Sequence, residues 1–352
     1  MSIIFAILLF SLLIFLHELG HFVAAKASGV QVNEFSMFMG PAIWKKQKGE
    51  TLYSIRCIPI GGYCAMEGED ASSDNPRAFA CAAWWKRLII LLAGAAMNFI
   101  AGVLILAVLL APMQQVNVLK ISSFEEWSTL NHADGLQVGD EILEVDGEKM
   151  YVFSDFSMML GINPGEVHDL VVSRDGQKVY LDDFVMQQHE TVDELGNKTM
   201  RYGVSFSVER VDFTGRMRYV GAIVLDWIRT VRLSLQMLLT GQAGLADMSG
   251  PVGIVQQMGQ QAEAAASWQE AALDMLYFGA FLAVNLAVMN LLPIPALDGG
   301  RVVALLLTTA IEAITHKKLN PKYEGYVHGA GMVLLLALMA VIMLKDIIFI
   351  FR

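Results

Sequence analysis

The chain has 352 residues, of which 55% are hydrophobic and only 17% are charged. This composition is too apolar for an ordinary soluble domain and indicates a protein embedded in a lipid bilayer. The net charge is −10, and most of it falls on one long region between apolar stretches, which argues against a nucleic-acid partner.

Four apolar stretches are each near the length of about 20 residues that a helix needs to cross a bilayer. They are Ser2–Ala25, Leu88–Met113, Leu273–Leu292 and Gly329–Ile350. The first has no basic segment before its apolar stretch and no small-residue cleavage site after it, so we expect a retained span and not a signal peptide. The sequence predicts a polytopic α-helical membrane protein with about four transmembrane helices.

Basic residues predict the orientation of these spans, because lysines and arginines in short loops stay on the cytoplasmic side. Such residues gather between spans one and two and again between spans three and four. We therefore expect both of these connections, including the residues after Asp298, to be cytoplasmic loops. Both termini and Gln114–Ala272 are then expected outside the cytoplasm.

The first span carries a polar cluster near its predicted inner end. His17 and His21 are four residues apart, so they project from one helix face and can share a metal ion. Glu18 is one position on, about 100° around the helix, where it can reach a metal-bound water without binding the metal. This spacing favours a zinc site with Glu18 as the base. The alternative is a buried polar cluster that joins helices.

A change of composition after the first span predicts a membrane-associated β-hairpin. Val30–Tyr63 carries β-branched and aromatic residues around the turn-like sequence KKQKGE. It ends in PIGGY, where Gly61 and Gly62 permit unusual dihedral angles or a close backbone approach. An exposed strand edge can pair with an extended peptide, and we expect it along Leu52–Ile58.

The second span contains one polar residue, Asn98, between Gly94 and Gly102 at intervals of four. Small residues at this spacing are typical of a face where membrane helices pack, and a buried asparagine can join the two helices. Contact with a substrate is the alternative for Asn98.

The long outer region predicts a compact α+β module over Ser122–Met186. Asp146-Gly147 and Asp175-Gly176 are hairpin turn signals, and a short helical run lies between them. Met217–Thr240 is apolar enough for a fifth span. Its charged residues recur on one side at helical spacing, however, so we expect an amphipathic helix at the outer surface.

The third span ends in NLLPIPALDGGR. Pro293 and Pro295 break the helix, and two glycines then let the backbone turn. Asp298 is a candidate third ligand, since catalytic zinc sites usually have three protein ligands and one open position. The alternative is that it merely begins the cytoplasmic loop. Asp298 can reach the depth of the histidines only if Met217–Thr240 does not cross the membrane.

These elements predict four parts of the chain. Residues 1–113 hold the first two spans and the hairpin, and residues 114–215 the outer region with its module. Residues 216–272 hold the amphipathic helix and a linker, and residues 273–352 hold the last two spans.

Taken together, HELGH at residues 17–21, PIGGY, Gly94 with Asn98, and NLLPIPALDGG resemble the site-2 protease family (peptidase family M50). The similarity covers nearly the whole chain and is closest to the bacterial, RseP-type intramembrane zinc metalloproteases. It implies His17, His21 and Asp298 as zinc ligands and Glu18 as the catalytic base. It also implies that Asn290 binds substrate or stabilises the oxyanion. Asn98, Gly61, Gly62 and Pro293 are the further candidates for substrate binding.

The resemblance also implies partners and a location. The expected substrates are membrane proteins with a single transmembrane helix, such as an anti-sigma factor or a signal-peptide remnant, with a site-1 protease acting first. The expected location is the bacterial plasma (inner) membrane. The outer module is similar to a PDZ domain, but the usual glycine–hydrophobic loop is not evident before NHADGLQVGD, which favours a size filter over capture of a peptide terminus.

Two other classes place polar residues within a membrane. A metal transporter needs them along a path through both leaflets, whereas here they are expected at one depth. A non-catalytic scaffold would have no need for Glu18 beside the histidines.

Overall fold

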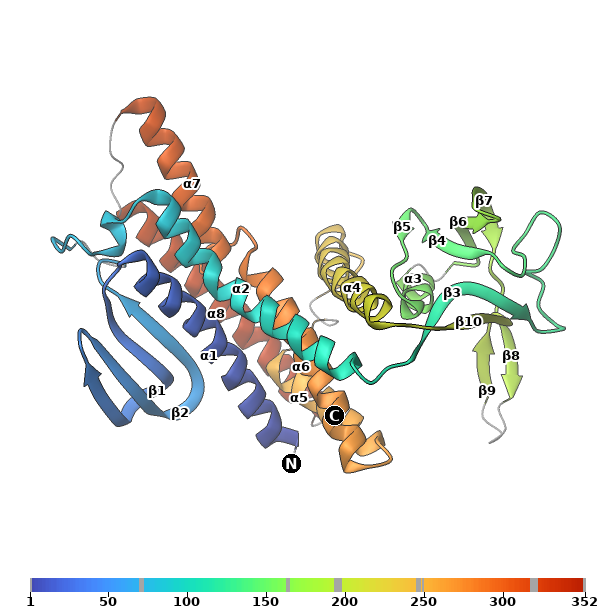
Figure 1. Cartoon of the computed structure of the whole chain (residues 1–352), viewed down its shortest axis with the longest axis horizontal. Helices are drawn as coiled ribbons and strands as arrows, with labels where there is room; N and C mark the ends of the chain where they lie inside the picture. The colour runs from blue at the N-terminus through green and yellow to red at the C-terminus, as the bar shows by residue number, and fades with distance from the viewer. Residues whose placement is uncertain are drawn as a thin grey trace. The chain divides into compact units, whose positions relative to one another are not determined.

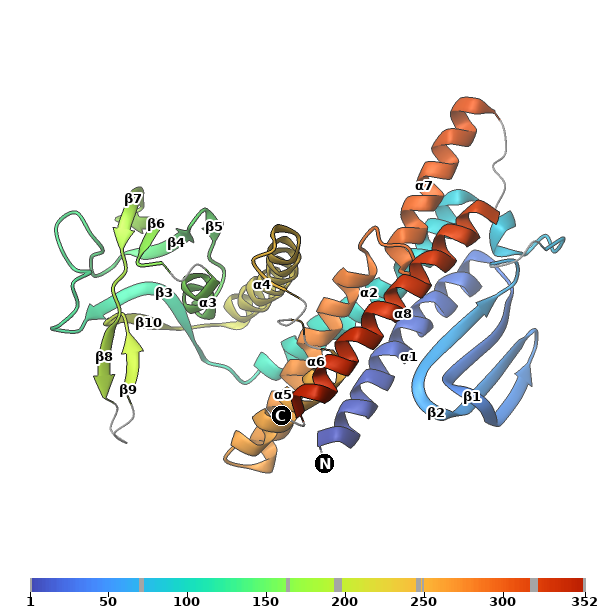
Figure 2. The ribbon, with the colours of Figure 1, turned by 180° about the vertical axis from the view of Figure 1, so that it is seen from behind.

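The computed structural model describes residues 2–69, 73–162, 165–192, 198–244, 248, 250–316 and 322–350. The chain divides into two compact units, Met1–Leu109 with Thr230–Arg352, and Leu110–Arg229. The first unit is a group of long helices with a β-hairpin, and the second is rich in strands (Figures 1 and 2).

Four helices among the described residues are long and apolar enough to cross a bilayer, as predicted. They are α1 (Ser2–Ser28), α2 (Trp84–Leu110), α6 (Trp268–Asn290) and α8 (Lys322–Ile350). Large apolar side chains point outward from them, for example Val108 at 72% and Leu334 at 71% exposure. Their number along these long helices indicates a surface that lipid covers.

Small residues let these helices approach closely. A Cβ at Gly20 of α1 would lie 2.2 Å from the carbonyl oxygen of Ala93 in α2. A Cβ at Gly102 of α2 would lie 2.8 Å from the Val284 side chain in α6. Both glycines are therefore required by packing, because lipid-embedded helices associate mainly through tight van der Waals contact.

The hairpin consists of β1 (Val32–Lys48) and β2 (Thr51–Met66), which pair antiparallel as predicted. Both strands bend, so residues 34–37 pair with 52–55 on one side and with 62–65 on the other. Residues 52–55 also pair with 44–47. The expectation of an open edge along Leu52–Ile58 is therefore wrong for residues 52–55, which lie inside the sheet. The edges are formed by residues 62–66 and 42–48.

Two further helices, α5 (Pro251–Ala264) and α7 (Asp298–Thr315), occupy stretches predicted as linker and cytoplasmic loop. α7 is anchored by Leu305, which lies in a core that includes Phe35 of the hairpin, Phe79 of the short helix η1 (Phe79–Cys81) and Ile90 of α2. This helix was not predicted, because the two glycines after Asp298 are typical of a turn.

α5 begins at a contact with the last span. The carboxylate of Asp346 in α8 accepts hydrogen bonds from the backbone N–H groups of Gly250 and Gly253, at 2.9 and 3.0 Å. A Cβ at Gly250 would lie 2.8 Å from that carboxylate. Asp346 thus satisfies two N–H groups at a helix start, where no partner exists within the helix.

The second unit is built on one sheet and one short helix, α3 (Phe153–Ile162). The strand order is β10-β3-β4-β6-β7, with β5 paired to β4. Its strands are β3 (Gln115–Phe124), β4 (Glu141–Val145), β5 (Glu148–Lys149), β6 (Val167–Arg174), β7 (Gln177–Val185) and β10 (Val204–Arg210). β8 (His189–Val192) and β9 (Lys198–Arg201) form a separate two-stranded sheet. The predicted turns at Asp146-Gly147 and Asp175-Gly176 are present, with φ positive at all four residues.

The sheet begins at Gln115 and ends at Arg210, so it extends beyond Ser122–Met186 on both sides. β10 pairs with β3, and its Phe206 packs edge-on against Phe153 and Phe156 of α3, at centroid distances of 5.2 and 5.4 Å. A glycine–hydrophobic sequence, Gly203-Val204, thus enters this sheet from the C-terminal side of the module.

α4 (Phe213–Thr240) is helical as predicted and is not one of the candidate spans. We expected the charged residues of this helix to face solvent, but two of them do not. Asp226 and Arg229 are buried, and Arg229 contacts Asp226 and, at 3.0 Å, Asp155 of α3. The charged side of this part of α4 is therefore a packing surface of the second unit.

Candidate metal centre

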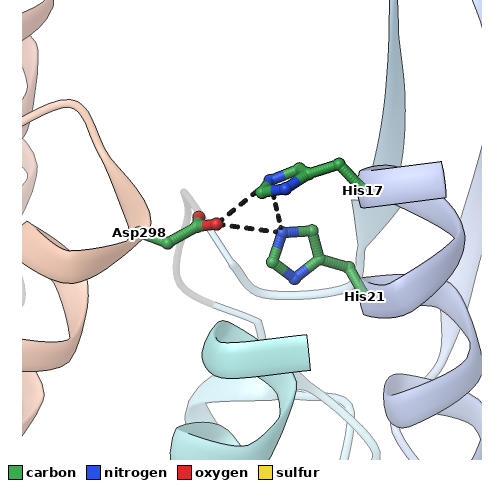
Figure 3. A group of neighbouring side chains, drawn as sticks. All are labelled: His17, His21 and Asp298. Atoms are coloured by element: carbon green, nitrogen blue, oxygen red, sulfur yellow. Dashed lines mark hydrogen bonds and ion pairs between the residues drawn. The ribbon is translucent and has the colours of Figure 1, made fainter. Parts of the chain in front are cut away.

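Three of the predicted site residues lie together in the first unit. His17 and His21 come from adjacent turns of α1, and Asp298 is the first residue of α7 (Figure 3). Oδ2 of Asp298 lies 3.0 Å from Nε2 of His17 and 3.2 Å from Nε2 of His21. The two Nε2 atoms are 3.1 Å apart. Among the described residues, this is the one group of three His, Cys, Asp or Glu side chains close enough to hold a metal ion.

The triangle of these three atoms has the dimensions of a zinc site. Zinc binds imidazole nitrogen and carboxylate oxygen at about 2.0–2.2 Å in a tetrahedron, which places ligand atoms about 3.3 Å apart. The observed separations are 3.0, 3.1 and 3.2 Å. Oδ2 of Asp298 is buried and has no hydrogen bond, since the geometry of neither short contact is that of one. The side chains therefore fit a metal ion better than they fit one another.

Contacts on the far side of each imidazole orient its Nε2. Nδ1 of His21 lies 2.8 Å from the carbonyl oxygen of Ile90 in α2, so Nδ1 carries the proton and Nε2 keeps its lone pair. Nδ1 of His17 lies 3.4 Å from the side-chain amide of Asn290, the last residue of α6. The contact of His21 with Ile90 is of the kind that fixes ring orientation and tautomer in metal-binding histidines.

Comparison with known proteins agrees with this geometry. The model of peptidase family M50 matches residues 5–338. A protein of Clostridium acetobutylicum, named as a candidate zinc metalloprotease, is 36% identical over 99% of this chain and 98% of its own length. The regulator of sigma-W protease RasP of Bacillus subtilis is 28% identical over 98% of both chains.

The chain belongs to peptidase family M50. It is a site-2-type zinc metalloprotease and a membrane protein, as the resemblance of its motifs implied. Within this M50 protease, the three polar side chains occupy the HELGH and LDGG motifs that carried that resemblance.

Glu18 of the M50 protease lies beside the hairpin. Its carboxylate accepts a hydrogen bond from the backbone N–H of Cys64 in β2 and interacts electrostatically with His17, His21 and Asp298. A Cβ at Gly62 would lie 3.6 Å from Cγ of Glu18 and 3.0 Å from the carbonyl oxygen of Ser36. Gly62 thus lies next to Glu18, and the tight contact that favours glycine there is the one with Ser36 of β1.

Gly94 of α2 makes room for the two imidazoles. A Cβ at this position would lie 2.4 Å from Nε2 of His21 and 2.7 Å from Cε1 of His17. No side chain larger than hydrogen fits there without displacing the rings. The sequence singled out Gly94 by its spacing to Asn98, but the reason for a glycine is the site, together with the helix contact.

The loop between α6 and α7 sets the position of Asp298. A Cβ at Gly299 would lie 2.3 Å from the carbonyl oxygen of Leu291, and one at Gly300 would lie 2.3 Å from that of Ile294. The two glycines thus let α7 start directly against the preceding loop. They do not form the turn that we expected.

α8 supports the same loop. The backbone N–H of Ala296 donates a hydrogen bond of 3.1 Å to Nδ1 of His328. Ala296 has a positive φ of 87°, a conformation that a residue with a side chain adopts only when its surroundings hold it. A Cβ at Gly331 would lie 2.4 Å from Cβ of Pro295.

The remaining predicted residues lie apart from the three-atom triangle. Gly61 has a positive φ of 79° and faces the side chain of Met39 in the hairpin. Pro293 is exposed in the loop before α7. Asn98 has no exposed surface, and neither side-chain polar atom has a hydrogen-bond partner among the described residues.

An ion-pair network at the end of α1 fixes the hairpin turn. Glu50 lies 2.6 Å from both Lys26 of α1 and Arg77 of the loop before α2. The hydrogen bond from Arg77, with help from Lys26, lowers the pKa of Glu50 to about 2. Glu50 therefore stays ionised, and the turn stays attached to α1, down to acidic pH.

Proposed function

We propose that this M50 protease hydrolyses peptide bonds within or near the transmembrane helix of single-span membrane proteins, using zinc held by His17, His21 and Asp298. The observation that carries the proposal is the triangle of two Nε2 atoms and one carboxylate oxygen, with edges of 3.0 to 3.2 Å. A tetrahedral zinc bound to three protein atoms keeps one position for water, as catalytic zinc sites do.

The protein's own groups supply the remaining chemistry. Bound zinc would polarise the scissile carbonyl and acidify its water. Glu18 takes a proton from that water and delivers it to the leaving amine. The amide of Asn290, beside His17, is placed to hold the substrate backbone or the oxyanion.

We further propose that the substrate adds as a strand to residues 62–66 of the hairpin. A peptide bond in a helix is shielded by its own hydrogen bonds, so the substrate must unwind, and a strand edge replaces the lost bonds. Residues 62–66 pair with β1 on one side, and none of the described strand pairings uses their other side. This is the strand that passes Glu18.

The proposed setting is the plasma (inner) membrane of a bacterium, with the termini and the second unit outside the cytoplasm. The name of the B. subtilis relative connects that protein with sigma-W. By analogy, an anti-sigma factor, first cut by a site-1 protease, is a proposed substrate here, and signal-peptide remnants are another. The second unit, which we infer to be PDZ-like, would limit access by size.

The test is cleavage of a panel of single-span proteins by the purified chain. Wild type should cleave at least one substrate, and chelator should abolish cleavage. Glu18→Gln should keep zinc and lose about 10²-fold or more in rate, because the base is gone while the ligands remain. A zinc-loaded Glu18→Gln protein that cleaves at the wild-type rate would contradict the assigned role of Glu18.

A proline scan tests the strand edge. Proline removes one backbone donor without touching the three zinc-binding side chains. Residue 64 is left out of the scan, because the N–H of Cys64 donates to Glu18 and its loss would affect the base itself. At least one folded, zinc-loaded proline variant at residues 62, 63, 65 or 66 should cleave much more slowly, and a substrate with helix-breaking residues near its cut site should be less affected. The matched control is a scan of the far edge, residues 42–48. Equal activity across both scans would eliminate strand addition at this edge.

A further inference from the structure

Arg301 lies one helical turn after Asp298 on α7. Residues three apart share a helix face, so the position of Arg301 and the aim of Asp298 are coupled through the first turn of α7. Arg301 forms an ion pair with Glu69, which follows the end of β2. The two side chains are only 19% and 13% exposed, so the pair is largely removed from water.

Glu69 itself stands on a well-held loop. The N–H of Glu67 donates to the carbonyl of Gln31 at 2.9 Å, and the carbonyl of Glu67 accepts from the N–H of Phe79 at 2.7 Å. Gly68 has a φ of 65°, and a Cβ there would lie 2.7 Å from that of Ala78. This turn needs glycine, and it places Glu69 two residues after Glu67, whose N–H and C=O groups are both hydrogen-bonded.

On the turns that follow, Val302 and Leu305 pack in the core shared with the hairpin, α1 and α2. Apolar burial is non-directional, so these two contacts constrain the rotation of α7 about its axis less than a directional bond does. A charge-assisted hydrogen bond from guanidinium to carboxylate is directional. A small rotation of α7 would carry Oδ2 of Asp298 away from the two Nε2 atoms.

We propose that Glu69 and Arg301 are positioning residues that lock the first turn of α7 so that Asp298 faces His17 and His21. This inference rests on the proposed zinc site. It connects the loop that follows the substrate-side strand to the ligand on α7, and it assigns the pair no contact with the reacting atoms.

The test is the rate of zinc release from the purified full-length chain to a chromogenic chelator. Glu69→Gln and Arg301→Gln should each release zinc about tenfold faster than wild type, the lower end of what outer neighbours of zinc ligands contribute. The charge-reversed double variant, Glu69→Arg with Arg301→Glu, should restore part of the loss. Glu50→Gln is the matched control: it breaks ion pairs in the same unit that do not involve α7, and it should release zinc as wild type does.

The possible results distinguish a failure of this inference from a failure of the proposed function. Wild type that holds no zinc would overturn the zinc site itself. If the wild type holds zinc and both single variants release it at the wild-type rate, the positioning role alone is overturned. Equal acceleration by Glu50→Gln, or no recovery in the double variant, would also overturn it, because general loosening of the fold would then explain the effect. If Arg301→Gln does not fold, Glu69→Gln decides the question, since it keeps the shape of the side chain.

Discussion

Two buried groups of ionisable side chains, one in each unit, are arranged in opposite ways. In the second unit, Arg229 contacts Asp226 and Asp155, donates to the carbonyl of Lys149, and lies over the ring of Tyr151. In the first unit, Nε2 of His17, Nε2 of His21 and Oδ2 of Asp298 lie 3.0 to 3.2 Å from one another. One group joins opposite charges, and the other gathers atoms that need a shared cation.

The difference shows that the burial of ionisable side chains does not by itself indicate a metal site. Each group contains three ionisable side chains that water barely reaches, and each joins elements distant in sequence. A guanidinium between carboxylates is balanced by the protein itself, which is the usual condition for burying charge. Two imidazole nitrogens and one carboxylate oxygen at 3.0 to 3.2 Å from one another have the spacing of zinc ligands, so their arrangement points to a metal ion.

Removing a metal ligand should have the largest effect. Asp298→Ala or His21→Ala leaves two ligands, and zinc affinity should fall by more than about 100-fold, beyond the loss typical of outer neighbours. Zinc content after gel filtration measures this, and Asp226→Ala is the matched control in the other group. A fully zinc-loaded Asp298→Ala protein would contradict ligation by Asp298.

The second-largest effect on zinc binding should come from filling the space beside the two imidazoles. In Gly94→Ala the new methyl group occupies positions now within 2.4 Å of His21, so the rings must move and zinc affinity should fall roughly tenfold or more. Gly102→Ala crowds the same helix against Val284 and should leave zinc binding unchanged. If both variants hold zinc equally well, the rings adapt more freely than the packing indicates.

Breaking the ion pairs of Arg229 should lower the stability of the second unit without changing zinc binding. Arg229→Met strands two buried carboxylates, and loss of one partner from a buried ion pair costs about 3–5 kcal/mol. Thermal unfolding of the purified chain, followed through the second unit by limited proteolysis, should show the loss. Zinc content should match wild type; a parallel loss of zinc would show that the two groups are energetically linked.

The smallest effect should be a pH dependence of the second unit. Burial, together with the nearby Asp155 carboxylate, raises the pKa of Asp226 to about 7, against 3.8 for an ordinary aspartate. The folded state thus holds a proton that the unfolded state releases between these values. The stability from this group is complete below about pH 4 and declines as pH rises through 7. The second unit should unfold at a lower temperature at pH 8 than at pH 5.

Asp226→Asn should flatten this dependence, because the amide does not titrate. Substitution of the exposed Asp182 by Asn is the control and should keep it. A wild-type unfolding temperature that rises between pH 5 and pH 8, in parallel with that of Asp226→Asn, would contradict the assignment.

What could be predicted from the sequence is what depends on local spacing. His17 and His21 are four residues apart in one helix, so their shared face follows from helix geometry. The four spans follow from length and apolar composition. Predicting the place of Asp298 required one further step, which was to infer the side of the membrane on which the third span ends. The structure places Asp298 beside the two histidines.

What could not be predicted depends on how distant segments approach. The role of Gly94 appears only when α2 lies against the histidines, and the bend of β2 appears only when residues 62–66 pair beside residues 34–37. The pair of Arg301 with Glu69 joins positions with no common motif. α7 was missed because Gly299 and Gly300, common turn residues, serve there to let backbones touch.

The separation of the site along the chain also bears on how the protein is made. His17 lies in the first span, whereas Asp298 comes after the third, and Asp346, which completes the start of α5, lies close to the C-terminus. While the ribosome is still adding residues 114–272, the chain already holds two imidazoles without their carboxylate. A nascent chain therefore completes this three-residue group only after the third span and Asp298 have been added.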